Sequence, residues 1–174
     1  MRKLNIISTL CCVLFFSQCK NIQNKDTMSG QKNNPYYSRT DTNRLQVSNS
    51  EWKTILPPDV YHIAREKGTE YAFSGKYWKT DTRGNYYCAV CGNPLFKSDA
   101  KFASSCGWPS FYEALHPGSV RYENDTSYGM RRTEVLCGRC DSHLGHIFDD
   151  GPPPTHQRFC MNSAVLEFEP DTAK

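Results

Sequence analysis

Two Cys-x-x-Cys pairs carry the clearest chemical signal in this sequence. They stand in "CAVCG" and "CGRC", as Cys88 with Cys91 and Cys137 with Cys140. Two residues between thiols let one tight turn direct both sulfurs at a single ion. Two such turns complete the tetrahedron of four thiolates that Zn²⁺ prefers. The pattern therefore predicts a structural zinc site, and redox-active Cys-x-x-Cys motifs and disulfides are the alternatives.

Two further cysteines stand alone, in "SSCGWPSF" and "RFCMNSA". Alternation along a strand would place Arg158, Cys160 and Asn162 on one face. A guanidinium near a thiol lowers its pKa and raises the thiolate fraction, so Cys160 is a candidate nucleophile and Arg158 a candidate substrate-binding residue. Cys106 could pair with Cys160 during a catalytic cycle, or the two could form one permanent disulfide.

Two histidines and a tryptophan are further candidates. His143 and His146 lie three residues apart in "DSHLGHIFDD", where they could be acid–base groups, metal ligands or surface residues. Trp108 lies between Gly107 and Pro109, so its indole could be presented at a surface or packed in a core. Residue types alone leave these alternatives open.

Short segments must position these side chains. "SNSE" at Ser48 has the form of a capping box for a helix that Pro57 and Pro58 end, and a second helix is predicted over 60–67. Five aromatic or β-branched segments follow, separated by Gly, Pro, Asn and Asp: "GNYYCAV", "SVRYEN", "TEVLC", "HIFDD" and "AVLEFE". The pattern predicts a mainly β fold, in which antiparallel strands form a small barrel-like core with short N-terminal helices.

The N-terminal segments predict an exported protein held at a membrane. Residues 1–19 combine a basic start with a short apolar run, which is typical of an export signal. The run ends at Cys19, as in a bacterial lipoprotein signal whose cysteine is lipidated. Residues 20–48 are polar and predict a flexible tether. The domain then covers 49–170, and 171–174 form a tail, so we expect a membrane-anchored lipoprotein of the bacterial cell envelope.

The charge argues against one class of partner. The net charge is +3 at pH 7, and two of the positive charges belong to Arg2 and Lys3 in the predicted signal. A protein that binds nucleic acid by neutralising phosphates normally has a clear basic surplus. We therefore expect no nucleic-acid partner, and we expect the chain to be a monomer.

Four motifs together resemble the B-type methionine sulfoxide reductases. They are "CAVCGNPLF", "SSCGWPSFYE", "GMRRTEVLCGRCDSHLGHIFDDGP" and "RFCMNSA", and the similarity runs from about Glu51 to about Phe168. The resemblance implies reduction of the R epimer of methionine sulfoxide, free or in proteins. Two positions depart from the family pattern, Phe159 where Tyr is common and Met161 where Val or Ile is usual. The zinc ligands that the resemblance implies are Cys88, Cys91, Cys137 and Cys140.

The resemblance also implies roles for the residues around the thiols. Cys160 is the nucleophile and Cys106 resolves the resulting sulfenic acid. Thioredoxin, or a thioredoxin-like protein of the envelope, then reduces the disulfide. Trp108 receives the methyl group of the sulfoxide, and Phe148 forms an aromatic wall. The polar groups around the sulfoxide oxygen are His143, His146 and Asn162.

The alternative from another functional class is a non-catalytic binding module that a zinc ion stabilises. It explains the Cys-x-x-Cys pairs, but it does not explain the cluster of Arg158, Cys160 and Asn162 or the additional Cys106. A disulfide scaffold is a third hypothesis, and it predicts few free thiols and no metal.

Overall fold

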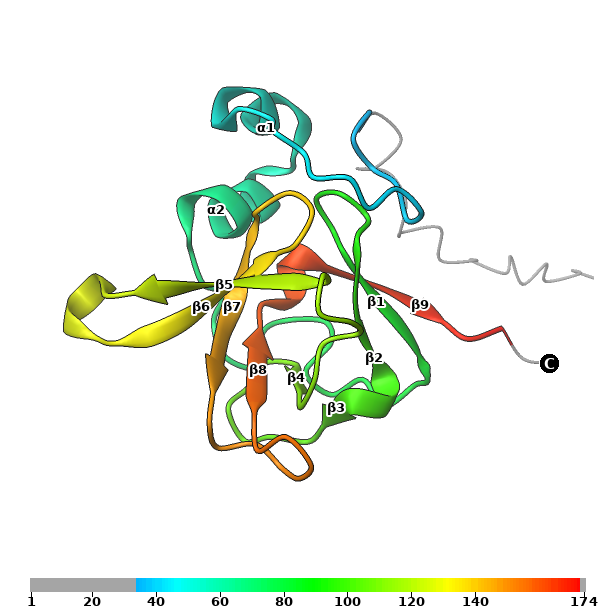
Figure 1. Ribbon diagram of the computed structural model, residues 1–174, viewed down its shortest axis with the longest axis vertical. Coiled ribbons are helices and arrows are strands. Elements are labelled where there is room, and N and C mark those ends of the chain that lie inside the picture. The colour runs from blue at the N-terminus through cyan, green and yellow to red at the C-terminus, as the bar shows by residue number, and fades with distance from the viewer. Residues whose placement is uncertain (1–33, 173–174) are drawn as a thin grey trace, which may run out of the picture.

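The computed structural model describes residues 34–172. Two helices, α1 (Asn49–Ile55) and α2 (Pro58–Glu66), precede the strands (Figure 1). The mainly antiparallel β fold with short helices is confirmed. The strands in this part of the chain are β1 (Gly84–Cys88), β2 (Pro94–Lys97), β3 (Lys101–Phe102), β4 (Ser110–Phe111), β5 (Val120–Asp125), β6 (Arg132–Cys137), β7 (His143–Phe148), β8 (Arg158–Met161) and β9 (Leu166–Pro170).

Local sequence signals explain both helices. Ser48 caps α1, because its side chain accepts a hydrogen bond from the Glu51 N–H at 3.2 Å. The Glu51 carboxylate does not complete the predicted capping box, since it accepts a hydrogen bond from the Tyr36 hydroxyl instead. Helix α2 begins at Pro58, whose missing N–H costs nothing in the first turn, and it ends where Lys67 takes a left-handed conformation.

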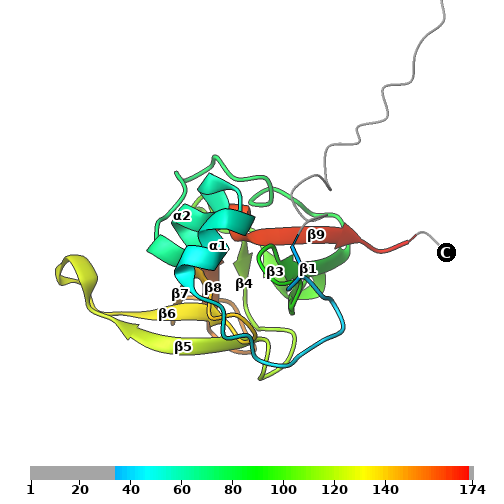
Figure 2. The same cartoon turned by 90° about the horizontal axis from the view of Figure 1, so that it is seen from above.

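The strands form two antiparallel sheets around one core (Figure 2). The smaller sheet has the order β2-β1-β9 and the larger one β3-β4-β8-β7-β6-β5. Aromatic side chains fill the core, and the rings of Phe96 and Phe111 stack with their centroids 4.4 Å apart. Each such fully buried side chain contributes about 1.5–3 kcal/mol relative to an exposed one. The largest fully buried side chains include Trp52, Tyr86, Phe96, Phe111 and Phe159.

The register of the larger sheet brings candidate site residues side by side. His146 of β7 pairs with Cys160 of β8, and Cys160 pairs in turn with Ser110 of β4. Residues directly opposite each other in a sheet point to the same face. One face therefore carries an imidazole, a thiol and a hydroxyl in a row, while the next residue back, Phe159, is buried in the core on the other face.

Residues 34–48 are packed onto the folded domain, so this part of the predicted tether is wrong. The Ser38 N–H donates a hydrogen bond to the Cys91 carbonyl at 3.0 Å. The buried guanidinium of Arg139 donates to the Asp41 carboxylate at 2.7 Å. The polar composition of the segment concealed this packing, because hydrogen bonds hold much of the segment and only three of its side chains, Tyr36, Leu45 and Val47, pack against the core.

The predicted signal at residues 1–19, its Cys19, and the first part of the tether at 20–33 lie outside the described residues. Between residues 34 and 172, no helix is long and apolar enough to cross a membrane. The N-terminal anchor therefore stays a prediction from the sequence.

Candidate active site and metal centre

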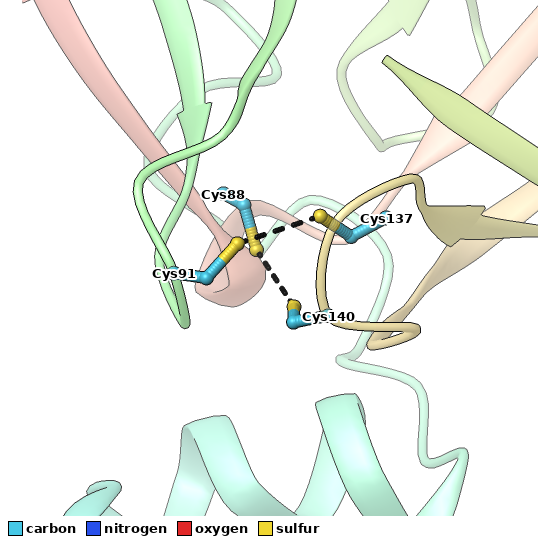
Figure 3. Close-up of side chains that lie close together, drawn as sticks. All are labelled: Cys88, Cys91, Cys137 and Cys140. Carbon is cyan, nitrogen blue, oxygen red and sulfur yellow. Dashed lines mark hydrogen bonds between the residues drawn. The ribbon is translucent and has the colours of Figure 1, made fainter. Parts of the chain in front are cut away.

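Four cysteine thiols meet where turns from the two sheets come together (Figure 3). Their sulfurs all lie within 4.8 Å of one another and are buried. Cys88 lies 3.8 Å from Cys140, and Cys91 lies 3.6 Å from Cys137, measured between sulfurs. A tetrahedral zinc ion with Zn–S bonds of about 2.3 Å requires sulfurs about 3.8 Å apart, whereas a disulfide requires about 2.05 Å. The geometry fits the predicted zinc site and not a pair of disulfides.

The surroundings of the four sulfurs also fit a bound cation. The Ser142 hydroxyl lies 3.2 Å from the Cys140 sulfur, and the Asn93 amide donates toward the Cys137 sulfur at 3.6 Å. The Arg139 guanidinium is buried beside them, where it offsets part of the negative charge of four thiolates. Four protein ligands would close the coordination shell, so the site has the donor set of a structural zinc rather than a catalytic one.

The two single cysteines lie next to each other, beside the row of His146, Cys160 and Ser110 on the larger sheet. Cys106 belongs to the loop between β3 and β4, and its sulfur lies 3.6 Å from that of Cys160 on β8. Both thiols are free and partly exposed. The structure therefore brings the predicted pair within reach of a disulfide bond through a small movement, since bonded sulfurs are about 2.05 Å apart.

The two thiols differ in acidity. Burial raises the pKa of Cys160 to about 12, the neighbouring Cys106 adds to this effect, and Arg158 opposes it. Burial also acts on Cys106, but the hydroxyls of Ser104 and Ser110, 2.8 and 3.4 Å from its sulfur, outweigh it and lower the pKa to about 7. The first negative charge of the pair therefore lies on Cys106. Arg158 lowers the pKa of Cys160, as the sequence predicts, but burial raises this pKa by more.

A small cavity of about 120 Å³ opens onto Cys160 and not onto Cys106. Its size suits the end of one side chain. Most candidates that the sequence placed around a sulfoxide line this cavity, whereas His143 and Arg158 do not. The lining residues are Thr69, Trp108, Arg132, Gly145, His146, Phe148, Cys160 and Asn162.

Asp125 orients His146, a contact that the sequence did not reveal. The Nε2 atom of His146 lies 2.7 Å from the Asp125 carboxylate, which also accepts from Arg132 at 2.6 Å. Hydrogen bonds from Ser127, with those from His146 and Arg132, hold the pKa of Asp125 well below its usual range. Within residues 34–172, the Nδ1 atom of His146 has no hydrogen-bond partner and is not buried. An ionised carboxylate therefore fixes one ring nitrogen and leaves the other free for a ligand.

His143 lies behind His146, away from the cavity wall. Its Nδ1 atom is 2.7 Å from the buried Glu134 carboxylate, which the Lys67 ammonium also contacts at 2.7 Å. Burial lowers the pKa of His143. The ring centroids of the two histidines are 5.4 Å apart. His143 is thus placed to support His146 by packing.

Arg158 shares a face of β8 with Cys160 but is bound elsewhere. Its guanidinium donates two hydrogen bonds to the Asp150 carboxylate, both at 2.8 Å. It also lies over the Phe148 ring, 4.5 Å from the centroid. Because Asp150 neutralises much of its charge, Arg158 acts on Cys160 weakly, and it also supports the Phe148 wall of the cavity.

Glu70 connects two further cavity residues and was also missed in the sequence. The Glu70 carbonyl accepts from the Trp108 indole N–H at 3.2 Å, and its N–H donates to the Asn162 side chain at 3.1 Å. Its carboxylate accepts from the backbone N–H groups of Ser163 and Ala164 at 2.7 and 3.0 Å. These bonds fix the indole and the amide relative to the strand that carries the nucleophile candidate.

Comparison with known proteins defines the class of this site. Residues 56–170 match the family model of the SelR domain, which is more than half of the chain. A peptide methionine sulfoxide reductase MsrB of Thiobacillus denitrificans is 58% identical over 123 residues, covering 71% of this chain and 93% of that protein. An MsrB of Methanosarcina mazei is 52% identical over 134 residues, covering 76% and 96%. The chain belongs to the MsrB family of peptide methionine sulfoxide reductases, which argues against the non-catalytic zinc module.

Proposed function

We propose that the protein reduces methionine-R-sulfoxide, free or in polypeptides, with Cys160 as the nucleophile and Cys106 as the resolving thiol. The observation that carries this assignment is the position of the two sulfurs. Cys160 lines the cavity, and Cys106 lies 3.6 Å from it without lining the cavity. The first thiol is therefore placed to meet a substrate, and the second is placed to meet the oxidised first thiol.

The cavity offers different walls to the groups on a sulfoxide sulfur. Trp108 and Phe148 supply apolar aromatic surfaces for the methyl group. His146 and Asn162 supply polar groups for the oxygen. The remaining substituent, the chain of the substrate, leaves through the opening. Distinct walls for distinct substituents favour one epimer, and the R preference is the one that the family resemblance supports.

The first step transfers oxygen from the substrate to the enzyme. A sulfoxide sulfur is a poor electrophile until its oxygen is hydrogen-bonded or protonated, and His146 is placed to do this. The Cys160 sulfur attacks, the oxygen moves to it, and the thiol proton ends on that oxygen. The products are methionine and the sulfenic acid of Cys160, so the substrate sulfur is reduced by two electrons and Cys160 is oxidised by two.

The second step regenerates the enzyme. The Cys106 thiol condenses with the sulfenic acid of Cys160, which forms a disulfide and releases water. Thioredoxin, or a thioredoxin-like envelope protein, then supplies two thiols, and thiol–disulfide exchange returns both cysteines to the reduced state while the partner becomes a disulfide. The short distance between the sulfurs and the low pKa of Cys106 support this role.

The four clustered cysteines would hold a zinc ion that takes no part in this chemistry. When bound, zinc supplies a cross-link that contributes its binding free energy to folding. Cys88 ends β1, and Cys91 lies in the turn between β1 and β2 of the smaller sheet. Cys137 ends β6, and Cys140 lies in the turn between β6 and β7 of the larger sheet, so the link would join the two sheets.

The test uses single-turnover and multiple-turnover assays with the separated R and S epimers. Cys160→Ser should form no methionine even once. Cys106→Ser should form about one methionine per enzyme from the R epimer and then stop with thioredoxin, while dithiothreitol restores cycling. Full single-turnover activity in Cys160→Ser would remove the nucleophile assignment, and normal thioredoxin cycling in Cys106→Ser would assign the resolving role to another residue.

We further propose that the protein acts as a monomer at the bacterial cell envelope, anchored through a lipid on Cys19. Support comes from the basic start and apolar run of residues 1–19, which precede that cysteine. Mass spectrometry of the mature N-terminus should find a lipidated Cys19, and Cys19→Ser should move the protein out of the membrane fraction. An unmodified N-terminus at another residue would contradict the anchor.

A further inference from the structure

Two exposed aromatic side chains stand beside the loop that carries Cys106. Tyr71 is 88% exposed and Phe73 is 54% exposed. A tight turn holds them, because the N–H and the hydroxyl of Ser74 both donate to the Tyr71 carbonyl, at 3.2 and 2.7 Å. Single exposed aromatics are common on protein surfaces, but two on one rigid turn form a patch that needs an explanation.

The backbone attaches this turn directly to the redox loop. Phe73 has a φ of 66°, a left-handed conformation that is rare for an aromatic residue. Its N–H donates to the carbonyl of Gly107, the neighbour of Cys106, at 2.8 Å. A Cβ at Gly107 would lie only 2.8 Å from the Phe73 nitrogen, so the two backbones touch. Unfavourable backbone geometry of this kind persists where surrounding structure holds it, often at functional positions.

The aromatic surface continues toward the other side of the Cys106 loop. The Trp78 ring packs edge-on against Phe73, with centroids 5.1 Å apart, and the Lys79 ammonium lies 4.5 Å above the Trp78 ring. Trp78 and Lys79 line a groove of about 350 Å³ that extends to Ser104, whose hydroxyl is 2.8 Å from the Cys106 sulfur. We call Tyr71, Phe73 and Trp78 the aromatic rim.

We propose that the aromatic rim is the docking surface for the protein dithiol that reduces the disulfide between Cys106 and Cys160. The inference rests on the proposed function. Reduction requires a thiolate of a second protein to reach one of these sulfurs, so the second protein must cover the surface next to them. The exposed aromatic side chains of the rim lie on that surface. The partner that fits is a small dithiol protein with apolar surface around its cysteines and negative charge opposite Lys79. Two thiols of the partner become a disulfide, and two electrons and two protons pass to Cys106 and Cys160.

An oxidised protein substrate is the other macromolecule that could use this surface. The cavity that receives the sulfoxide is lined by none of the three rim residues. The rim contacts the Cys106 loop, through Gly107, instead. The observations therefore favour the reductant, and the substrate becomes an outcome of the test.

The test compares two reductants on one double variant, Tyr71→Ser with Phe73→Asn. Asparagine tolerates the left-handed conformation of Phe73, so the turn should persist. With thioredoxin, its reductase and NADPH, we expect the KM for thioredoxin to rise about tenfold, which corresponds to a loss of about 1.4 kcal/mol of binding free energy. Dithiothreitol needs no docking surface, so turnover with it should be unchanged.

The matched control is Tyr128→Ser, which also removes an exposed tyrosine. Tyr128 is 92% exposed at the tip of the β5–β6 hairpin, which extends away from the rest of the domain (Figures 1 and 2). Its KM for thioredoxin should be unchanged. An unchanged KM for thioredoxin in the double variant would overturn the docking surface. A raised KM for an oxidised protein, measured with dithiothreitol, beside an unchanged KM for thioredoxin would assign the rim to the substrate and also overturn it. Failure of the parent protein with both reductants would refute the proposed function instead.

Discussion

Asp125→Ala tests whether the His146 side chain must be oriented by a carboxylate. Asp125 accepts from the Nε2 atom of His146 at 2.7 Å and from Arg132 at 2.6 Å. The pKa of Asp125 lies well below its usual range, chiefly because of hydrogen bonds from Ser127, so the carboxylate stays ionised at neutral and mildly acidic pH. Removing it frees the imidazole to turn and leaves it without its charged partner.

The expected loss follows from the strength of one charge-assisted hydrogen bond. Such a bond contributes about 1.5–3 kcal/mol. At about 1.36 kcal/mol for each factor of ten, kcat/KM should fall by about 10- to 150-fold. The loss should fall mainly on kcat, because the proposed contact of His146 with the sulfoxide oxygen strengthens as negative charge develops on that oxygen.

The assay is dithiothreitol-driven reduction of a peptide containing methionine-R-sulfoxide, with kcat and KM measured separately. Asp149→Ala is the control, since this exposed residue lines the same surface pocket as Asp125 and forms no hydrogen bond with His146. The nitrogen-15 NMR shifts of His146 should report the loss of the hydrogen bond at Nε2 in Asp125→Ala only. A folded Asp125→Ala variant with kcat within twofold of the parent would refute the reasoning.

Three further predictions concern the metal centre, the thiol pair and the core. Cys137→Ser should lose zinc and melt at a much lower temperature, because the proposed ion would link the two sheets. Elemental analysis and thermal unfolding measure both effects. Alkylation of the reduced protein should modify Cys106 with a midpoint near pH 7, since its thiolate forms as the pH rises through a pKa of about 7. Cys160, with a pKa of about 12, should stay unmodified below about pH 9. Mass spectrometry distinguishes the two modified cysteines. Phe96→Ala should lower the free energy of unfolding by about 3–5 kcal/mol in urea denaturation, because it leaves a cavity in the aromatic core.

Each of these predictions has an outcome that contradicts it. A Cys137→Ser variant with full metal content and an unchanged melting temperature would contradict the structural role of the cluster. Alkylation of Cys160 before Cys106 would show that the charge of the pair is divided in the opposite way. A loss below about 1 kcal/mol for Phe96→Ala would mean that the core relaxes to fill the space. Packed cores usually relax only partially after a large-to-small substitution.

The parts of the structure that the sequence could predict are those set by local patterns. The Cys-x-x-Cys spacing identified four clustered thiols, because a tight turn fixes two sulfurs without help from the rest of the chain. The segments of β1, β5, β6, β7 and β9 were indicated by aromatic and β-branched residues between turn residues. The family resemblance, and not residue spacing, supplied most roles of the candidate site.

The parts that escaped prediction depend on long-range contacts. Strand β4 has only two residues, and its pairing of Ser110 with Cys160 joins distant segments, so no local periodicity marks it. Strand β2 has adjacent buried residues, Leu95 and Phe96, which break the alternation expected of a half-buried strand. Asp125 reaches His146 across 21 positions of sequence, a contact that only the β5–β6–β7 register creates.

His146, Cys160 and Ser110 form a row across three strands. Insertions in these strands should therefore be tolerated less well than insertions in the loops. Inserting one residue into β8 between Arg158 and Phe159 would turn the Cys160 thiol toward the core and the Phe159 ring toward the cavity, because side chains alternate between faces. Insertions at the tip of the β5–β6 hairpin would leave that row untouched. Natural variation in chain length should therefore accumulate in the connections and be excluded from the central strands.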